Sequence, residues 1–274
     1  MIKTQRIIKY CAIAFAILLT FNIVSAIMYG IISFGNVFSR NDIDNDSALT
    51  ETLKELNIKN NIEKIDINVK SVNVIVNEGT NFKVETNNKY INIKENNNRL
   101  SINENNHNWL NIKNETKLII YIPSNYIFND VSIENGAGKI EINTMTTKKI
   151  DLDLGAGQVD IQNLTVSTEA DIDGGAGEII IKNSQLNNLD LDMGAGKLTL
   201  NSSLTGNNKI DAGVGELNIN LVGTSEDYKI KLNKGIGNSI LNNEKMQNDT
   251  YYGTGNNLIN IDGGIGSIKI NYSR

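Results

Sequence analysis

Cysteine, proline, histidine and tryptophan each occur only once in this 274-residue chain, which narrows what the protein can be. The lone cysteine, Cys11, lies in an apolar N-terminal run, so neither an internal disulfide framework nor a cysteine–histidine catalytic pair is possible. The lone histidine, His107, has no cysteine or second histidine near it, and we interpret it as a surface residue. Without disulfides, the stability of the fold must come from the packing of its own segments.

Signatures of catalysis and of nucleic-acid binding are also missing. The sequence contains no G-x-x-x-x-G-K-[ST] phosphate loop and no Ser-His-Asp set in a suitable context. Its formal net charge of −5 gives no reason to expect nucleic acid as a partner. We therefore expect a protein that is not an enzyme and that carries no cofactor.

Glycine is abundant, and much of it follows a repeat. A Gly-x-Gly motif recurs five times at spacings of 19 or 20 residues, and two more divergent copies follow. A period of this length indicates stacked structural units that build an extended surface. The expected structural corners are Gly136 and Gly138, Gly155 and Gly157, Gly175 and Gly177, Gly194 and Gly196, Gly213 and Gly215, Gly235 and Gly237, and Gly264 and Gly266.

Apolar and polar residues alternate on both sides of each motif, which is typical of strands that bury one face. The pattern predicts an all-β fold, a parallel β-solenoid, in which two short strands meet at each Gly-x-Gly corner. Successive rungs would stack at roughly 4.8 Å. The glycines would permit positive φ angles or a close approach of the neighbouring backbone. We expect the Ala, Val or Ile between them to point inward.

The last two copies depart from this regularity. Around Gly235, Ser239 stands where the other copies have an aliphatic residue and Ile240 follows it, so we expect a shifted or bulged second strand. The segment between Gly237 and Gly264 is an insertion that contains Tyr251 and Tyr252. Long loops on repeat arrays often carry binding function, so these tyrosines are candidate contacts for a glycan or a protein. The alternative is that they pack on the last rung.

The first 40 residues have a different character. Lys3, Arg6 and Lys9 precede an apolar run from Tyr10 to about Phe34, which is long enough to cross a bilayer as a helix. The basic flank predicts a cytoplasmic N-terminus and an extracytoplasmic remainder, and hence a single-pass protein of the cell membrane. The alternative interpretation is a signal peptide cleaved after Ala26.

The chain therefore divides into four regions. Residues 1–40 form the basic tip and membrane anchor, and residues 41–60 a tether or short helix. Residues 61–128 form a leading β region that begins or caps the stack, and residues 129–274 form the repeat solenoid. An Asn-rich loop of the leading region holds Trp109, a further candidate for contact with a partner.

These pieces together resemble a bacterial family of envelope proteins. The chain combines a basic-flanked anchor with a strand that ends at Pro123 and with rungs such as Leu152–Ile161. This is similar to the "putative adhesin" domain family, a domain of unknown function common in Firmicutes envelope proteins, over roughly residues 60–274. The resemblance implies a β-helical ectodomain at the surface of a Gram-positive cell and supplies no catalytic motif.

An acidic residue precedes most of the corners by two positions. If the rungs stack in register, these carboxylates lie about 5 Å apart and repel each other, and a divalent cation would relieve the repulsion. The alternative is that they face solvent and accept hydrogen bonds from nearby backbone. The candidate column is Glu134, Asp153, Asp173, Asp192 and Asp211, with a second column at Asp151, Asp171 and Asp190.

The sequence as a whole favours a membrane-anchored, extracytoplasmic β-solenoid that acts by interaction, as an adhesin or in the response to envelope stress. Its partner would be a cell-wall glycan or a surface protein. Two other functions stay open: a polysaccharide-active enzyme on a β-helix, and a purely structural spacer. An enzyme needs acids whose environments push their pKa values apart, whereas a column repeated five times is typical of structure.

Overall fold

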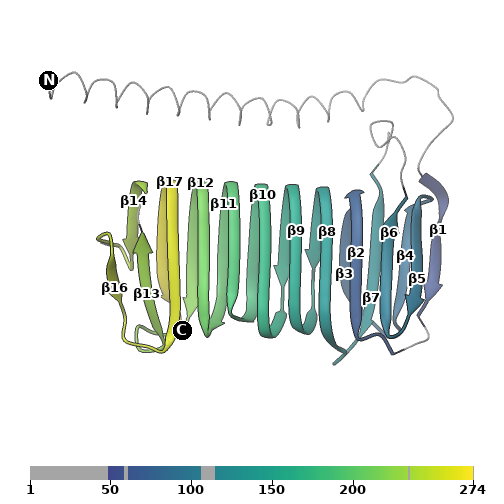
Figure 1. Cartoon of the computed structure of the whole chain (residues 1–274), viewed down its shortest axis with the longest axis horizontal. Helices are drawn as coiled ribbons and strands as arrows, with labels where there is room; N and C mark the ends of the chain where they lie inside the picture. Colours follow the sequence, from purple (N-terminus) through teal and green to yellow (C-terminus); the bar gives the residue numbers. More distant parts are fainter. Residues whose placement is uncertain (1–48, 59–60, 106–114, 234, 274) are drawn as a thin grey trace, which may run out of the picture. The chain divides into compact units, whose positions relative to one another are not determined.

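The computed structural model describes residues 49–58, 61–105, 115–233 and 235–273 (Figure 1). Every helix or strand assigned within these residues is a strand, and the strands join into one sheet of 17. The predicted all-β fold is confirmed. The predicted membrane anchor, Trp109 and His107 lie outside the described residues. Within the described ranges, no helix has the length and apolarity that a membrane span requires.

Five long strands form the centre of the stack. They pair in parallel and in chain order, so that each Gly-x-Gly corner lies against the next and the register aligns Ala137, Ala156, Ala176, Ala195 and Val214. Each strand bends at its corner and so supplies the two legs on either side of it. The strands are β8 (Ile127–Ile142), β9 (Met145–Gln162), β10 (Leu164–Asn187), β11 (Leu189–Thr205) and β12 (Asn207–Val222).

Both predicted reasons for glycine at the corners are confirmed. At the second glycine of each motif the backbone has a positive φ, between 120° and 152°. A Cβ atom added to Gly177 would lie 1.8 Å from the carbonyl oxygen of Gly157 in the preceding rung. The first glycine has no positive φ, but a Cβ on Gly175 would lie 2.4 Å from the carbonyl oxygen of Gly155. Neither position has room for a side chain.

The leading β region begins the stack, as predicted. Strands β2 (Lys64–Ser71) and β3 (Asn73–Gly79) pair in parallel with the two legs of β8, and Ser71 lies opposite Ala137 at the corner. They form a rung without a Gly-x-Gly motif. Strands β6 (Arg99–Glu104) and β7 (Lys117–Pro123) then pair in parallel with β2 and β3 as the next rung outward.

Antiparallel strands cover this outer rung. β5 (Ile91–Asn96) pairs with β6, β4 (Lys83–Asn88) pairs with β7, and β1 (Leu49–Asn57) pairs with β4. The helix predicted within residues 41–60 is therefore wrong for 49–57, which form a strand. The spacing of Leu53 and Leu56 suits a helix face, but pairing with the free edge of β4 outweighs that local pattern.

The C-terminal end does not follow chain order. β17 (Asn257–Ser273) lies between β12 and the pair β13 (Tyr228–Asn233) and β14 (Ile236–Leu241), which precede it in the sequence. The insertion supplies two short antiparallel strands: β15 (Glu244–Lys245) pairs with β14, and β16 (Thr250–Tyr252) with β13. Figure 1 shows β13, β14 and β16 beyond β17 at this end.

The predicted shift after Gly235 is wrong. Gly237 pairs with Gly266, and Ser239 and Leu241 pair with Ile268 and Ile270, so β14 keeps the register of the stack. Ser239 occupies a core position and is 2% exposed. A small polar residue can hold this position because backbone pairing sets the register, independently of the side chain that points inward.

The core is a column of aliphatic side chains from both legs of each rung, such as Leu152 and Val159. The prediction that the residue between the glycines points inward is wrong: Ile236 is 58% and Ile265 38% exposed. Because the chain turns here, the alternation is interrupted, and the residue before the first glycine takes the inward place. Buried residues at that position are Asn135, Leu154, Gly174, Met193 and Ala212.

Aromatic side chains pack at the two ends of the stack. At the leading end, the rings of Phe82, Tyr126 and Phe128 pack together, with the Phe82 centroid 5.4 Å from that of Tyr126 and 6.0 Å from that of Phe128. At the other end, Tyr228 and Tyr272 stack with their centroids 6.2 Å apart. These larger rings close the aliphatic column where the repeat stops.

Candidate functional site

The acidic column is a straight row on the outside of the stack. Strand pairing places Glu134, Asp153, Asp173, Asp192, Asp211 and Asp262 opposite one another in successive rungs. The second row, Asp151, Asp171 and Asp190, runs beside it. Neighbours in a row are therefore roughly 4.8 Å apart at the backbone. The predicted in-register ladder is confirmed.

Burial and neighbouring charges raise the pKa values of three carboxyl groups at the centre of these rows. Partial burial raises the pKa of Asp173, and the neighbouring charges of Asp171 and Asp153 raise it further. The pKa values of Asp151 and Asp171 are raised in the same way, first by burial and then by nearby carboxylates. Each group makes it harder for its neighbours to ionise.

Side chains that offset the negative charge, or donate hydrogen bonds to it, lie toward the ends of these rows. Lys209 places its Nζ atom 2.7 Å from an oxygen of Asp211 and 3.8 Å from one of Asp190. At the far end, the Nδ2 atom of Asn233 donates to Asp262 at 2.6 Å. At the leading end the side chain of Asn68 donates to Glu134. Among the described residues, no lysine or arginine forms an ion pair with the central carboxylates Asp151, Asp153, Asp171 and Asp173.

The structure does not gather these acids into a metal-binding cluster. Over the described ranges, no three His, Cys, Asp or Glu residues are grouped so that they could hold a metal ion. The rows place each carboxylate beside only a few others, whereas calcium takes six to eight oxygen ligands. Cation binding by Asp153, Asp173, Asp192 and Asp211 stays a prediction.

The two tyrosines of the insertion have different surroundings. Both lie on β16, which packs against β13 at the end of the stack. Tyr251 is 53% exposed, and the Nζ atoms of Lys229 and Lys231 lie 4.7 and 5.8 Å from its ring centroid. Tyr252 is half-buried against the core, and its hydroxyl accepts a hydrogen bond from the amide of Gln247 at 2.6 Å. Tyr251 is thus the more exposed of the pair, and its contact with a partner stays a prediction.

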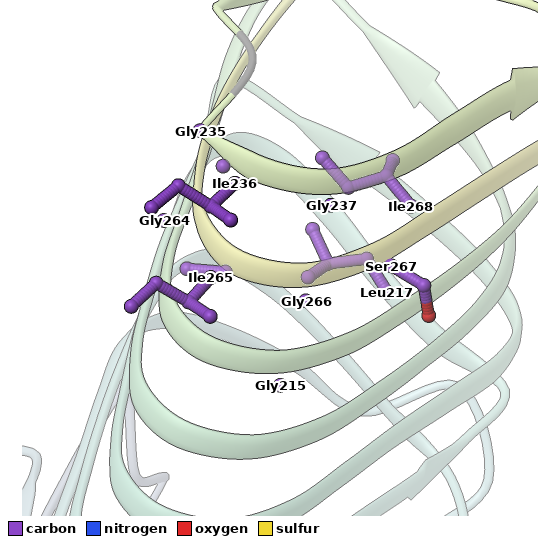
Figure 2. A pocket seen from close by; sticks show the side chains of 12 residues that line it. Gly215, Leu217, Gly235, Ile236, Gly237, Gly264, Ile265, Gly266, Ser267 and Ile268 are labelled. Atoms are coloured by element: carbon purple, nitrogen blue, oxygen red, sulfur yellow. The ribbon is translucent and has the colours of Figure 1, made fainter. Parts of the chain in front are cut away.

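A third row, which runs along the corners themselves, was not predicted from the sequence. The residues between the glycines lie in register on the outside, and they grow along the stack from Ala195 to Val214, Ile265 and Ile236. The last two flank a shallow hollow at the C-terminal corner. Figure 2 shows them one above the other at successive turns. The change from alanine to isoleucine in later copies is the signal that could have revealed it.

The fold defines the class of protein: a parallel β-solenoid with Gly-x-Gly corners and antiparallel strands at its ends. The chain belongs to the Toastrack DUF4097 family, whose model matches residues 62–256. This agrees with the resemblance drawn from the sequence. No curated protein matches the chain.

Solved structures of similar chains come from several bacteria. One is described as a "putative cell adhesion protein" from Clostridium sporogenes, 15% identical, and the match covers 81% of this chain and 99% of that chain, with a TM-score of 0.36. Another is a "putative adhesin" from Bacteroides fragilis, 15% identical over 81% and 98% of the two chains, with a TM-score of 0.28. A third, from Parabacteroides merdae, is 14% identical over 81% and 96%, with a TM-score of 0.39.

Proposed function

We propose that this protein is a membrane-anchored, extracytoplasmic interaction domain that binds a component of the cell envelope. The basic-flanked apolar run within residues 1–40 supports the anchor, and membership of the Toastrack family supports an interaction domain. The β-solenoid would present its outer rows to a cell-wall glycan or a surface protein. It would act without catalysis and without a cofactor.

One observation carries this proposal: an acidic side chain recurs rung after rung at the same position, from Glu134 to Asp262. Catalytic carboxyl pairs need environments that drive their pKa values apart. Here Asp151, Asp171 and Asp173 share the same causes and the same direction of pKa shift. A repeated, evenly spaced row of negative charge suits an extended partner that carries regularly spaced cationic or hydrogen-bond-donating groups.

The binding experiment uses the full-length chain in mild detergent, with purified cell-wall polymer and a glycan array as ligands. The variant Asp153→Asn/Asp173→Asn/Asp192→Asn removes charge from three successive rungs and should weaken binding at low salt. The control, Asp66→Asn, removes a carboxylate that is already paired with Arg99 at 2.9 Å and should leave binding unchanged. Equal binding by the triple variant and the control would argue for a structural spacer.

The role of the insertion needs a point substitution. Deleting residues 244–257 would remove β15 and β16 and uncover the end of the stack. Tyr251→Ser removes the exposed ring and keeps Tyr252 and both strands. A weaker complex for Tyr251→Ser, with Tyr126→Phe as a tyrosine control at the other end, would place the partner at this loop. Unchanged binding would exclude Tyr251 as a contact.

The proposed location is tested separately. In intact cells, an added protease should digest residues 41–274 and leave the extreme N-terminus protected. A chain that resists protease until the cells are lysed would contradict the extracytoplasmic location.

A further inference from the structure

The last rung of the stack leaves part of its edge open. This rung consists of β13 and β14, which pair with β17 on one side. On the other side β16 covers only residues 230–232, and β15 only residues 240 and 241. No strand in the described ranges covers Gly235, Ile236, Gly237 and Asn238, and all four residues are exposed. Such an edge offers backbone groups for pairing with another extended segment.

This stretch also lacks the charged residues that are found on the outer strands β1 and β5. Strand β1 carries Lys54 and Glu55, and strand β5 carries Lys94 and Glu95. Charged side chains on an edge strand oppose the addition of a further strand. The sequence Gly-Ile-Gly-Asn at the open corner has no charge, and Ile236 at its centre is 58% exposed. The corner is thus both unpaired and uncharged.

The geometry of the corners determines which residues a further segment can have at the open edge. The carbonyl oxygen of Gly215 lies 1.7 Å from where a Cβ on Gly266 would be, and that of Gly266 lies 1.6 Å from where a Cβ on Gly237 would be. Each corner carbonyl therefore faces the next rung and leaves space only for glycine. By the same geometry the carbonyl of Gly237 faces the open end. A segment that continues the stack must have glycine opposite Gly237 and opposite Gly235.

A folded second copy cannot take this place. Strands β15 and β16 already occupy parts of the layer in which the next rung would lie. A complete rung from another molecule would collide with them, whereas a short extended segment fits between them. Beside the corner, Asp211, Asp262 and Asn233 line a second shallow hollow. Asp211 is paired with Lys209, and the remaining negative charge of Asp262 favours a basic residue next to the glycines of the segment.

We propose that the open corner, Gly235 to Asn238, is a docking site for a short extended peptide of a partner protein. The peptide carries Gly-x-Gly with an aliphatic central residue and basic flanks, and it adds in parallel as one further strand. Its aliphatic residue covers Ile236 and continues the corner row. This deepens the interaction role proposed above and rests on it only for the cellular source of the peptide.

The probe is a fluorescent peptide, Lys-Gly-Gly-Ile-Gly-Lys, added to the full-length chain in mild detergent; with its last two glycines opposite Gly235 and Gly237, its ends stop short of β16 and β15. Fluorescence anisotropy gives the affinity, and hydrogen exchange locates the site. We expect saturable binding, with slower exchange at residues 235–238. A peptide with valine in place of the second and third glycines should bind at least tenfold more weakly. Failure of the chain to bind cell-wall material would not affect this result.

Two variants of the protein complete the test. Ile236→Lys places a charge on the open edge and should weaken peptide binding at least tenfold. Ile127→Lys makes the same change at an isoleucine that is 61% exposed on β8 and should bind like the unchanged chain. Equal melting temperatures show that both variants fold. Equal affinity for both peptides, or for both variants, overturns the proposal, as does a concentration-dependent dimer that Ile236→Lys abolishes.

Discussion

Two glycines in one rung, Gly174 and Gly177, should differ strongly in how much stability is lost when each is replaced by alanine. At Gly177 the backbone has a φ of 148°, and the new Cβ would lie 1.8 Å from the carbonyl oxygen of Gly157. At Gly174 φ is not positive, and the nearest atom, at 2.5 Å, is the terminal methyl of the Ile179 side chain. The equivalent positions in adjacent rungs hold Leu154 and Met193, so this site accepts a side chain.

The expected magnitudes follow from these contacts. An L-residue held in this φ region costs about 1–3 kcal/mol. Relieving the clash at Gly177 means moving two rungs apart at the corner and weakening one or two inter-rung hydrogen bonds, each worth about 0.5–1.5 kcal/mol net. Gly177→Ala should therefore lose about 1.5–6 kcal/mol of unfolding free energy. Gly174→Ala should change it by less than about 1 kcal/mol, since it also restricts the unfolded chain.

Urea denaturation of the two variants, followed by circular dichroism, measures the difference. Two spectroscopic probes should be compared, because a repeat array can lose its cooperativity and then has no single unfolding free energy. If Gly177→Ala is no less stable than Gly174→Ala, the close approach of the corner carbonyls does not explain the glycine repeat, and the argument for a glycine-containing peptide at the open corner also fails.

Other consequences of the structure can be measured in the same way. The folded-state pKa values of Asp151, Asp171 and Asp173 are raised, so the folded state binds protons more tightly than the unfolded state. The free energy of unfolding should therefore rise as pH falls from 7 toward the ordinary aspartate range. This gain should shrink in high salt. At pH 7, Asp173→Asn should stabilise by a few tenths of a kcal/mol because the group is exposed and screened, whereas Asp66→Asn, which loses the Arg99 ion pair, should not. A fall in stability between pH 7 and 5 would contradict this. Phe128→Ala, at a fully buried ring of the leading aromatic cluster, should cost about 3–5 kcal/mol in a urea titration, and Ile127→Ala, beside it but 61% exposed, close to nothing.

The repeat unit was predictable from the sequence because every copy repeats the same local requirements. Glycine occurs where the stack has no room for a Cβ, and aliphatic residues occur where the legs face inward. The in-register rows of acids follow directly, since the same position in each copy has the same place in each rung. Period and pattern therefore define the centre of the molecule.

The direction of the residue between the glycines was not predictable from alternation. Alternation in a strand has a period of two, and the corner interrupts it at the positive-φ glycine. Ala156 and Ala176 did not indicate the outward direction, because alanine is accommodated both in a core and on a surface. Ile236 and Ile265 were expected to point inward with the other central residues, yet they lie on the outside of the turn.

The ends of the stack depend on information that a repeat does not contain. Any rung can pair with any other, so similarity between copies cannot tell that β17 lies between β12 and the last rung. The insertion decides it: β15 and β16 pair antiparallel with β14 and β13, which takes the chain to the outer side of that rung before β17 returns inside. β17 pairs along both of its edges and so has no free edge, whereas the rung displaced outward keeps one. The same rearrangement that places the C-terminal strand in the interior thus leaves Gly235–Asn238 uncovered, and it makes the break in the repeat, rather than the repeat itself, the place to look for a specific partner.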